Sequence, residues 1–281
     1  MNLLSRLRVT ITAVPFTLAH PAAVLPLRRR GLVFSALVVG SMAPDFEYFF
    51  GLKRPISHTM PGILTFTLPL ALAVLIIFHV IVKWPAIWLL PHGLQARVIG
   101  PARRFRWFPV TRLFQILVSL VIGLATHILW DGFTHSDGWA AAYWPQLRHV
   151  VSVPQYHPMR LFAALQLFCS VIGVLVLALS LVRWYLRTVP EPVAMRPQFA
   201  PAIRWSILIA MIVTATALGY TNGSEWYGSL VGGSHRARFV IGFTLTAISV
   251  TALEIVGFGL LWRMILARSP RQLATVIDDS R

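Results

Sequence analysis

The segment Leu113–Phe133, LFQILVSLVIGLATHILWDGF, decides the fold class of this chain. Apart from His127 and Asp131 it carries no ionisable side chain, and a helix of about 20 such residues is long enough to cross a bilayer. Four other stretches have the same character: Pro61–Val82, Leu161–Val182, Ile203–Tyr220 and Phe239–Trp262. The pattern predicts an all-α protein, a polytopic bundle of transmembrane helices.

The composition of the whole chain excludes a soluble domain. Of its 281 residues, 57% are hydrophobic and 12% are charged, whereas soluble domains carry about 25% charged residues. Apolar residues are also far too abundant for a disordered chain. The chain has a single cysteine, Cys169, which lies within an apolar stretch. One cysteine can form neither an intramolecular disulfide nor a thiolate metal cluster.

The charged residues are strongly biased, with 25 Lys and Arg against 9 Asp and Glu. They lie in short loops between apolar stretches, as arginines do in polytopic membrane proteins, so we expect no nucleic-acid partner. Four segments, 1–30, 83–112, 183–204 and 263–281, hold 19 of the 25 basic residues. The positive-inside rule therefore predicts a multi-pass protein of the cell membrane with both termini in the cytoplasm.

The N-terminal region is apolar but interrupted. Gly31–Phe50 has the length of a span and is broken by Pro44, Asp45 and Glu47, and we count it as a sixth span. Before it, Val9–Leu27 contains three prolines, which favours a broken or re-entrant half-helix over a straight span or a cleaved signal peptide. We therefore expect about six spans.

A proline-rich connector divides the chain. Residues 187–201 contain four prolines, a pattern typical of a loop. The sequence thus predicts a membrane domain over residues 1–186 with a metal site, the connector at 187–201, and a C-terminal two-helix transmembrane hairpin over 202–281 that completes the bundle.

Ionisable side chains at membrane depth are costly and commonly functional. His127 and Asp131 are four residues apart in the span quoted above, so they share one face of the helix, and His135 continues that face if the helix extends. Imidazole nitrogens and carboxylate oxygens at this spacing can ligate one divalent cation. The alternative is a His–Asp hydrogen bond that only neutralises two buried polar groups.

Three further clusters carry the same kind of ligand. Asp45 and Glu47 stand in a Pro-Asp-x-Glu motif, and His58 stands in a Ser-His-Thr motif. His20 stands directly before Pro21, where the short half-helix His20–Leu27 begins. Each is ambiguous alone, because such residues also end or cap helices. The predicted topology brings four residues to one face of the membrane: Asp45, His58, Asp131 and His135. Nitrogen and oxygen ligands without cysteine predict a divalent metal, Zn or Mn.

Four motifs extend over the same region. They are VPFTLAHPAAV at residues 14–24, GSMAPDFE at 40–47, ISHT at 56–59 and THILWDGFTH at 126–135. Together they resemble a bacterial family of unknown function, catalogued as domain of unknown function 4184. The resemblance covers most of residues 10–180.

More distantly, the order of these motifs is similar to that of the LexA-regulated, membrane-bound metal-dependent hydrolases. The similarity implies five metal ligands in this chain: His20, Asp45, His58, His127 and Asp131. Two positions depart from that pattern, because Glu47 replaces a second aspartate and Lys53-Arg54-Pro55 stands where a further histidine is found. Without that histidine a second metal ion would lack a ligand, which favours one-metal chemistry, or no chemistry, over a two-metal site.

The residues and the resemblance together predict a membrane-embedded metal-dependent hydrolase that acts at the extracytoplasmic face. Glu47 or His135 would be the general base. The position of the site at the bilayer surface implies an amphiphilic phosphoester substrate, such as a phospholipid or an isoprenoid phosphate ester. Lys53 and Arg54 are candidates to hold its phosphate. Membrane lipid is the expected partner, and no protein partner is predicted.

Two other functions stay open. An ion or metal transporter needs ionisable groups staggered through the membrane, which His79 and Glu254 supply, although no inverted repeat is visible. A non-catalytic membrane scaffold would hold a structural metal in a closed ligand shell.

Overall fold

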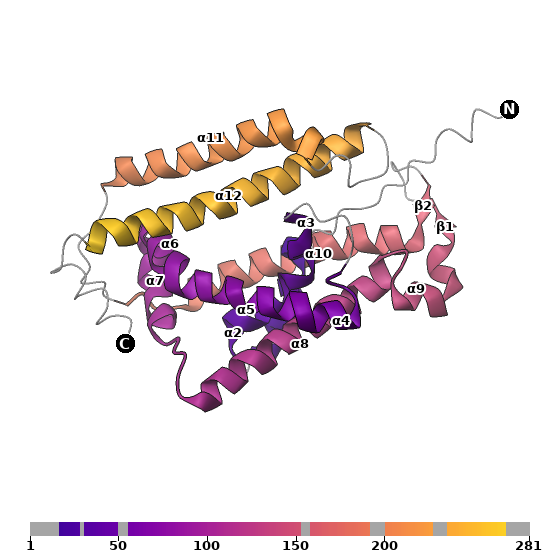
Figure 1. Ribbon diagram of the computed structural model, residues 1–281, viewed down its shortest axis with the longest axis horizontal. Coiled ribbons are helices and arrows are strands. Elements are labelled where there is room, and N and C mark those ends of the chain that lie inside the picture. The colour runs from indigo at the N-terminus through magenta and orange to yellow at the C-terminus, as the bar shows by residue number, and fades with distance from the viewer. Residues whose placement is uncertain are drawn as a thin grey trace.

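The computed structural model describes residues 17–28, 31–49, 56–152, 158–191, 200–226 and 235–267. Helices make up nearly all of this part of the chain, and one small antiparallel sheet pairs β1 (Val150–Val151) with β2 (Met159–Arg160). Figure 1 shows the short N-terminal helices, in indigo, among the longer ones. The predicted all-α polytopic membrane bundle is confirmed.

Five helical segments are long and apolar enough to cross a membrane: Met60–Leu89, Val110–Tyr143, Leu161–Arg187, Pro201–Asn222 and Phe239–Ile265. Each coincides with one of the five stretches predicted from the sequence. Their elements are α4 (Met60–Gly62), α5 (Leu68–Ile77), α6 (Lys83–Leu89), α8 (Val110–Thr134), α9 (Trp139–Tyr143), α10 (Leu161–Arg187), α11 (Pro201–Trp226) and α12 (His235–Ala267). Two π-helical turns, η5 (Ile63–Thr67) and η6 (Phe78–Val82), join α4, α5 and α6, and α7 (His92–Arg103) and η7 (Pro145–Arg148) lie in the connections.

The expected sixth span is a series of short helices: α2 (Phe34–Met42), η4 (Ala43–Asp45) and α3 (Phe46–Phe49). With nine residues, α2 rises about 13 Å, less than half of a hydrocarbon core of about 30 Å. Pro44 lies at the break, where its missing N–H group cannot continue the helical hydrogen bonds. The segment therefore does not form a continuous spanning helix, and Asp45 lies at its interruption.

Upstream, the expected half-helix is present as η2 (Thr17–Ala19), α1 (Pro21–Val24) and η3 (Leu25–Leu27). Together they form one short apolar helical segment, Thr17–Leu27. Its prolines Pro21 and Pro26 stand at or next to the first residues of α1 and η3, where a missing N–H is tolerated. Residues 9–16 of the predicted half-helix lie outside the described residues.

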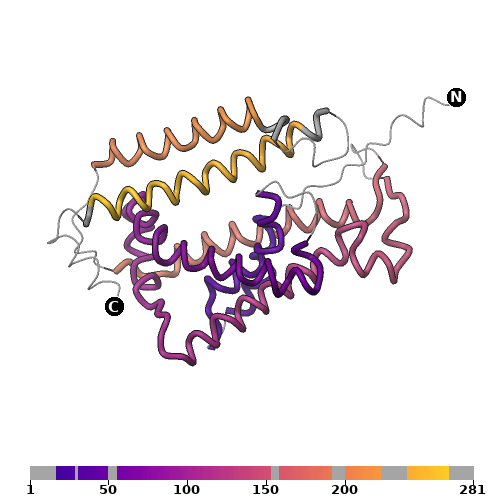
Figure 2. Tube along the Cα trace, in the orientation of Figure 1, coloured from indigo at the N-terminus to yellow at the C-terminus, as the bar shows by residue number. Residues whose placement is uncertain are grey.

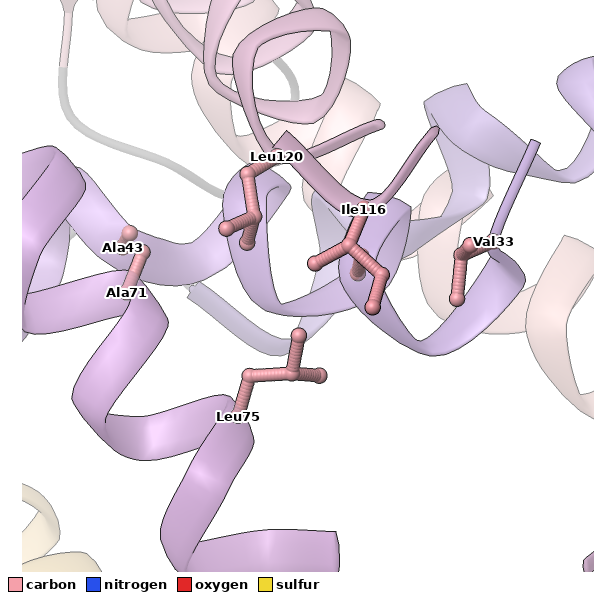
Figure 3. Packing of buried hydrophobic residues seen from close by; sticks show 7 residues of the cluster. Val33, Ala43, Ala71, Leu75, Ile116 and Leu120 are labelled. Carbon is pink, nitrogen blue, oxygen red and sulfur yellow. The ribbon is translucent and has the colours of Figure 1, made fainter. Parts of the chain in front are cut away.

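The short helix α2 is held tightly between α5 and α8. A Cβ atom on Gly40 would collide with the carbonyl oxygen of Leu120, and one on Gly123 would collide with that of Leu37. Small residues allow this close backbone approach between membrane helices. An apolar cluster covers the adjoining surfaces: Val33, Ala36, Ala43, Ala71, Leu75, Ile116 and Leu120. Figure 3 shows these side chains gathered between the helices, and the packing fixes the turn at residues 43–45.

The C-terminal helices α11 and α12 form a hairpin along one side of the molecule, orange and yellow in Figure 2. α12 contacts α3, η6 and α6, so the hairpin docks on the N-terminal part of the chain. At the start of the connector, the Glu191 N–H donates to the Ala96 carbonyl at 2.8 Å, and its carboxylate pairs with Arg104 at 3.9 Å. Residues 192–199 lie outside the described part, and the proposed division into domains stays a prediction.

Candidate metal centre

The C-terminal part of α8 carries the centre of the site. His127 and Asp131 are 0% and 7% exposed. His127 Nδ1 lies 2.8 Å from the carbonyl oxygen of Ser41. Because a carbonyl only accepts, Nδ1 donates, and in the neutral ring the lone pair is on Nε2. Nε2 faces Asp131 Oδ2 at 3.0 Å. A histidine whose second nitrogen is fixed by a carbonyl is oriented as metal-ligating histidines are.

Asp45 reaches the same point from the turn between α2 and α3. Its Oδ2 accepts a 2.7 Å hydrogen bond from Thr17 Oγ1, and its Oδ1 lies 3.6 Å from His127 Nε2. Both Asp45 Oδ1 and His127 Nε2 are buried, and neither has a hydrogen-bond partner in the described part of the chain. Buried polar atoms are nearly always satisfied, so two electron-rich atoms that face each other in this way indicate a cation site.

His58 completes the group from the loop before α4. Its Nε2 lies 3.5 Å from Asp131 Oδ2, and its Nδ1 lies 2.9 Å from Ser57 Oγ and 3.8 Å from Glu47 Oε1. Glu47 is 1% exposed, and its Oε2 accepts from the Ser57 N–H at 3.2 Å. Glu47 therefore lies behind His58, where an outer carboxylate orients a ligating histidine.

The four side chains offer a coordination shell of suitable size. One ligand atom from each of Asp45, His58, His127 and Asp131 lies within 4.8 Å of all the others. In a tetrahedral zinc site the bonds are about 2.0–2.1 Å long, which places the ligand atoms about 3.3 Å apart. Three of the separations here are 3.0, 3.5 and 3.6 Å. This group of residues can hold a divalent metal ion.

His20 contacts the site from another side. Its Nε2 donates to Asp131 Oδ1 at 3.1 Å, and its ring stacks on His127 with centroids 4.0 Å apart. His20 is not one of the four residues whose ligand atoms converge. The arrangement favours His20 as a residue that holds Asp131 in position over the ligand role that the resemblance implies.

His135 follows the last residue of α8, at the accessible edge of the site. Its Nδ1 lies 3.5 Å from Asp131 Oδ1 and 3.2 Å from Thr134 Oγ1. Its Nε2 contacts Nε2 of Gln166, on α10, at 3.2 Å. The side chain is 23% exposed, in contrast to the fully buried His127. His135 thus faces a carboxylate through Nδ1, and Nε2 of its partly exposed ring accepts from the Gln166 amide.

The surrounding carboxylates control the protonation of His58. Burial by itself lowers the pKa of His58, but the hydrogen bonds to Asp131 and Glu47 and the charge of Asp45 outweigh it and raise the pKa to about 10. Without a metal ion, both nitrogens of the His58 ring are therefore protonated at neutral pH. The positive charge of the ring compensates part of the negative charge of the carboxylates. A metal ion must displace one of these protons in order to bind.

Three residues that orient the site are absent from the sequence prediction: Thr17, Ser41 and Gln166. Ser41 acts through its backbone carbonyl, which the residue type does not reveal. Thr17 lies three residues before His20 in one of the motifs, and Gln166 is the one amide side chain in the apolar sequence of α10. A lone amide in such a segment signals a buried partner.

Replacing Thr17 with valine is expected to lower the zinc affinity about 10- to 100-fold, as loss of a residue that orients a ligand usually does. The substitution keeps the bulk of the side chain and removes the hydroxyl that orients Asp45. Competition with a chromophoric chelator measures the affinity. Thr244→Val is the matched control, because that hydroxyl donates to Val240 within α12. An unchanged affinity in Thr17→Val would contradict the assignment of Asp45 as a ligand.

The remaining predicted residues lie elsewhere. His79 contacts Ser35 Oγ at 2.9 Å and stacks on Phe105, so it belongs to a separate cluster, as expected. Glu254 Oε2 is buried on α12 with no hydrogen-bond partner among the described residues. The two proposed phosphate-binding residues, Lys53 and Arg54, lie outside the described residues.

A helical bundle of membrane-spanning length with a buried His/Asp group defines an integral membrane protein with a candidate metal centre. The chain belongs to the family described as Domain of unknown function (DUF4184), whose model matches residues 14–268. The match extends beyond the motifs quoted above and includes the C-terminal hairpin. No curated protein and no solved structure matches the chain. The more distant similarity to the LexA-regulated hydrolases stays a prediction.

Proposed function

We propose that this protein is a membrane-embedded, metal-dependent hydrolase. The observation that carries the proposal is the pairing of His135 with Asp131 on the same partly exposed side as His58, at the edge of a four-residue ligand group whose other three members are buried. A purely structural metal site needs no partly exposed histidine beside one of its ligands. A hydrolytic site needs a general base near the attacking water, because a proton must leave it, and histidine has this role most often.

The residues divide the chemistry between them. A divalent cation held by Asp45, His58, His127 and Asp131 would polarise the scissile group and lower the pKa of a bound water. His135 would take the proton at Nε2, which would have to give up its contact with the Gln166 amide, and Asp131 Oδ1, 3.5 Å from its Nδ1, would stabilise the resulting imidazolium, as the carboxylate does in hydrolytic triads. Glu47 was the other candidate base, but its place behind His58 suits it to orienting that ligand.

The surroundings of the site support an amphiphilic substrate. Directly after His135, α9 carries Trp139, 41% exposed, and Tyr143, 78% exposed. Exposed Trp and Tyr are enriched where a membrane protein meets the headgroup region. The distribution of basic residues predicts that this end of the bundle lies at the extracytoplasmic face. We infer a phosphoester amphiphile, a phospholipid or an isoprenoid phosphate ester, as the substrate class.

One observation favours a second function, a membrane scaffold with a structural metal. Four protein ligands fill a tetrahedral shell, whereas catalytic zinc sites keep one position open. Asp45 and His127 are fully buried, as residues of a closed site would be. A scaffold would hold its ion without exchange and without turnover, which separates the two functions experimentally.

The proposal is tested by hydrolysis assays on the full chain in detergent–lipid micelles loaded with zinc or manganese. The substrates are phosphatidic acid, phosphatidylglycerol and farnesyl diphosphate. We expect metal-dependent turnover of one of them, and a rate at least about 100-fold lower in His135→Gln, with the metal content unchanged. His149→Gln, at an exposed position in the following loop, is the matched control. Protein with one tightly held ion and no turnover of any substrate would overturn the hydrolase in favour of the scaffold.

A further inference from the structure

A second site lies between α6, α11 and α12. These helices enclose a groove of about 310 Å³, and all but one of its lining residues are apolar. Residues from all three helices contribute, among them Ala86, Leu90, Leu208, Met211, Thr251 and Phe258. The apolar lining suits a long hydrocarbon chain. Binding of one specific molecule, rather than of any lipid tail, also requires a polar group at one end of the groove.

That polar group is Arg204. It lies on α11 four residues before Leu208, so the two share one face of the helix. Its Nη1 is 3.4 Å from the carbonyl oxygen of Leu90, another residue of the groove. The side chain therefore sits at the end of the groove. Arg204 is only 9% exposed, and its Nε is buried without a hydrogen-bond partner among the residues that the structure describes.

No carboxylate in the described part of the chain forms an ion pair with Arg204. The carboxylates of Asp45, Glu47 and Asp131 pair with histidines of the metal centre, and Glu191 pairs with Arg104. A buried cation without a counter-charge is strongly unfavourable. The buried guanidinium of Arg204 therefore requires a nearby anion. The described residues around it provide no carboxylate that could fill this role.

Capping of α6 does not account for Arg204. The carbonyl oxygens of Trp88 and Leu90, at the end of α6, already accept hydrogen bonds from Gln95 Nε2 at 3.2 and 2.7 Å. The contact from Arg204 to Leu90 is longer than either, at 3.4 Å. The guanidinium group has five N–H donors in a fork that suits a phosphate. Its contacts among the described residues are this one weak hydrogen bond and the ring of Trp205, whose centroid is 5.6 Å from Cζ, and neither supplies a negative charge.

We propose that the groove binds an acyl chain of an anionic phospholipid whose phosphate contacts Arg204. An apolar groove that ends at an unpaired, buried arginine matches such a lipid in both hydrophobicity and charge. Basic pockets between membrane helices on the cytoplasmic side are known to bind anionic headgroups, and the distribution of basic residues assigns the start of α11 to that side.

This lipid site is separate from the metal centre and independent of the proposed hydrolase. His58 precedes the first residue of the 30-residue helical segment Met60–Leu89, and the groove lies at its other end. A helix of that length measures about 45 Å. A lipid at Arg204 is therefore a structural or regulatory ligand, on the opposite side of the membrane from the candidate substrate.

Native mass spectrometry of the full chain in mild detergent tests the site with phosphatidylglycerol and phosphatidylcholine added in equal amounts. We expect one phosphatidylglycerol to be retained per chain in preference to phosphatidylcholine. Arg204→Gln should lower this retention at least about tenfold, as loss of one charged hydrogen-bond partner does. Arg187→Gln, at an exposed position on the last turn of α10, should leave it unchanged.

A second variant keeps the charge and fills the groove. Ala86→Phe places a ring among the lining residues without changing Arg204, and it should also lose the lipid while eluting as a folded protein on size exclusion. Retention equal to that of the wild type in Arg204→Gln or in Ala86→Phe would overturn the proposal. Equal binding of the two lipids, or displacement of the lipid by inorganic phosphate alone, would also overturn it.

Discussion

Replacing Asp131 with alanine is expected to remove the metal from the protein, from about one ion per chain to less than about one tenth, because a four-ligand site loses its shared ligand. Asp131 Oδ2 lies 3.0 Å from His127 Nε2 and 3.5 Å from His58 Nε2. Its Oδ1 accepts from His20 at 3.1 Å and faces His135 at 3.5 Å. No other carboxylate in the described residues contacts as many imidazoles, so its loss leaves the histidines without a common partner.

The measurement is elemental mass spectrometry on protein purified in detergent without chelators. Asp137→Asn is the matched control, because this aspartate is exposed and lies in the loop just after α8. Asp131→Asn keeps the shape of the side chain and should lose the metal as well, since a neutral amide is a poor ligand for a transition metal. Circular dichroism establishes that each variant keeps its helices.

Two outcomes would contradict this prediction. A full ion per chain in Asp131→Ala would show that the ligand assignment is wrong. A wild-type protein without metal would show that the His–Asp contacts are protonated hydrogen bonds, as His58 with its raised pKa already allows. The hydrolase proposal would then be abandoned, whereas the lipid site at Arg204 would be unaffected.

The spans were predictable because membrane crossing depends mainly on the length of an apolar segment. All five long stretches are helices of sufficient length. The length of the apolar segment did not predict the structure of Gly31–Phe50 correctly. This segment is apolar and long enough to span, but its helix is broken at Pro44. Its structure depends on the close packing of α2 against α8, and a contact between segments so distant in sequence leaves no periodic signal.

The candidate metal ligands were easier to predict from the sequence than the residues that orient them. The spacing of His127 and Asp131 identifies a shared helix face, and the positive-inside rule brings Asp45 and His58 to the same end of the bundle. In contrast, the Ser41 carbonyl that fixes His127 comes from 86 residues away, and Thr17 reaches Asp45 across 28 residues. Backbone acceptors and hydroxyls at such distances depend on the folded arrangement.

Replacing Gly123 with valine is expected to destabilise the fold and to remove the metal without altering any ligand. A Cβ at this position collides with the carbonyl oxygen of Leu37 and lies 2.8 Å from the backbone N of Ser41. Overpacking usually costs about 1–3 kcal/mol. Here the obstacle is backbone on a neighbouring helix, which cannot rotate away as a side chain can, so we expect the upper part of that range.

Gly123→Val should also weaken metal binding, because α2 positions two residues of the metal centre. Ser41 lies in the last turn of α2 and supplies the carbonyl that orients His127, and Asp45 follows three residues after its end. If α2 moves away from α8 to admit the new side chain, both contacts lengthen together. Gly123→Ala should show a smaller loss of the same kind, because it adds the Cβ alone.

Thermal unfolding in detergent, followed by tryptophan fluorescence with and without zinc, measures both effects. Zinc should raise the unfolding temperature of the wild type, since it binds the folded state, and should leave that of Gly123→Val unchanged. Gly257→Ala is the matched control, because its Cβ meets nothing within 4 Å and alanine improves helix propensity by about 1 kcal/mol. A Gly123→Val protein with wild-type stability and full zinc response would show that α2 and α8 do not meet at these glycines. The ligand geometry that depends on their contact would then have to be abandoned with it.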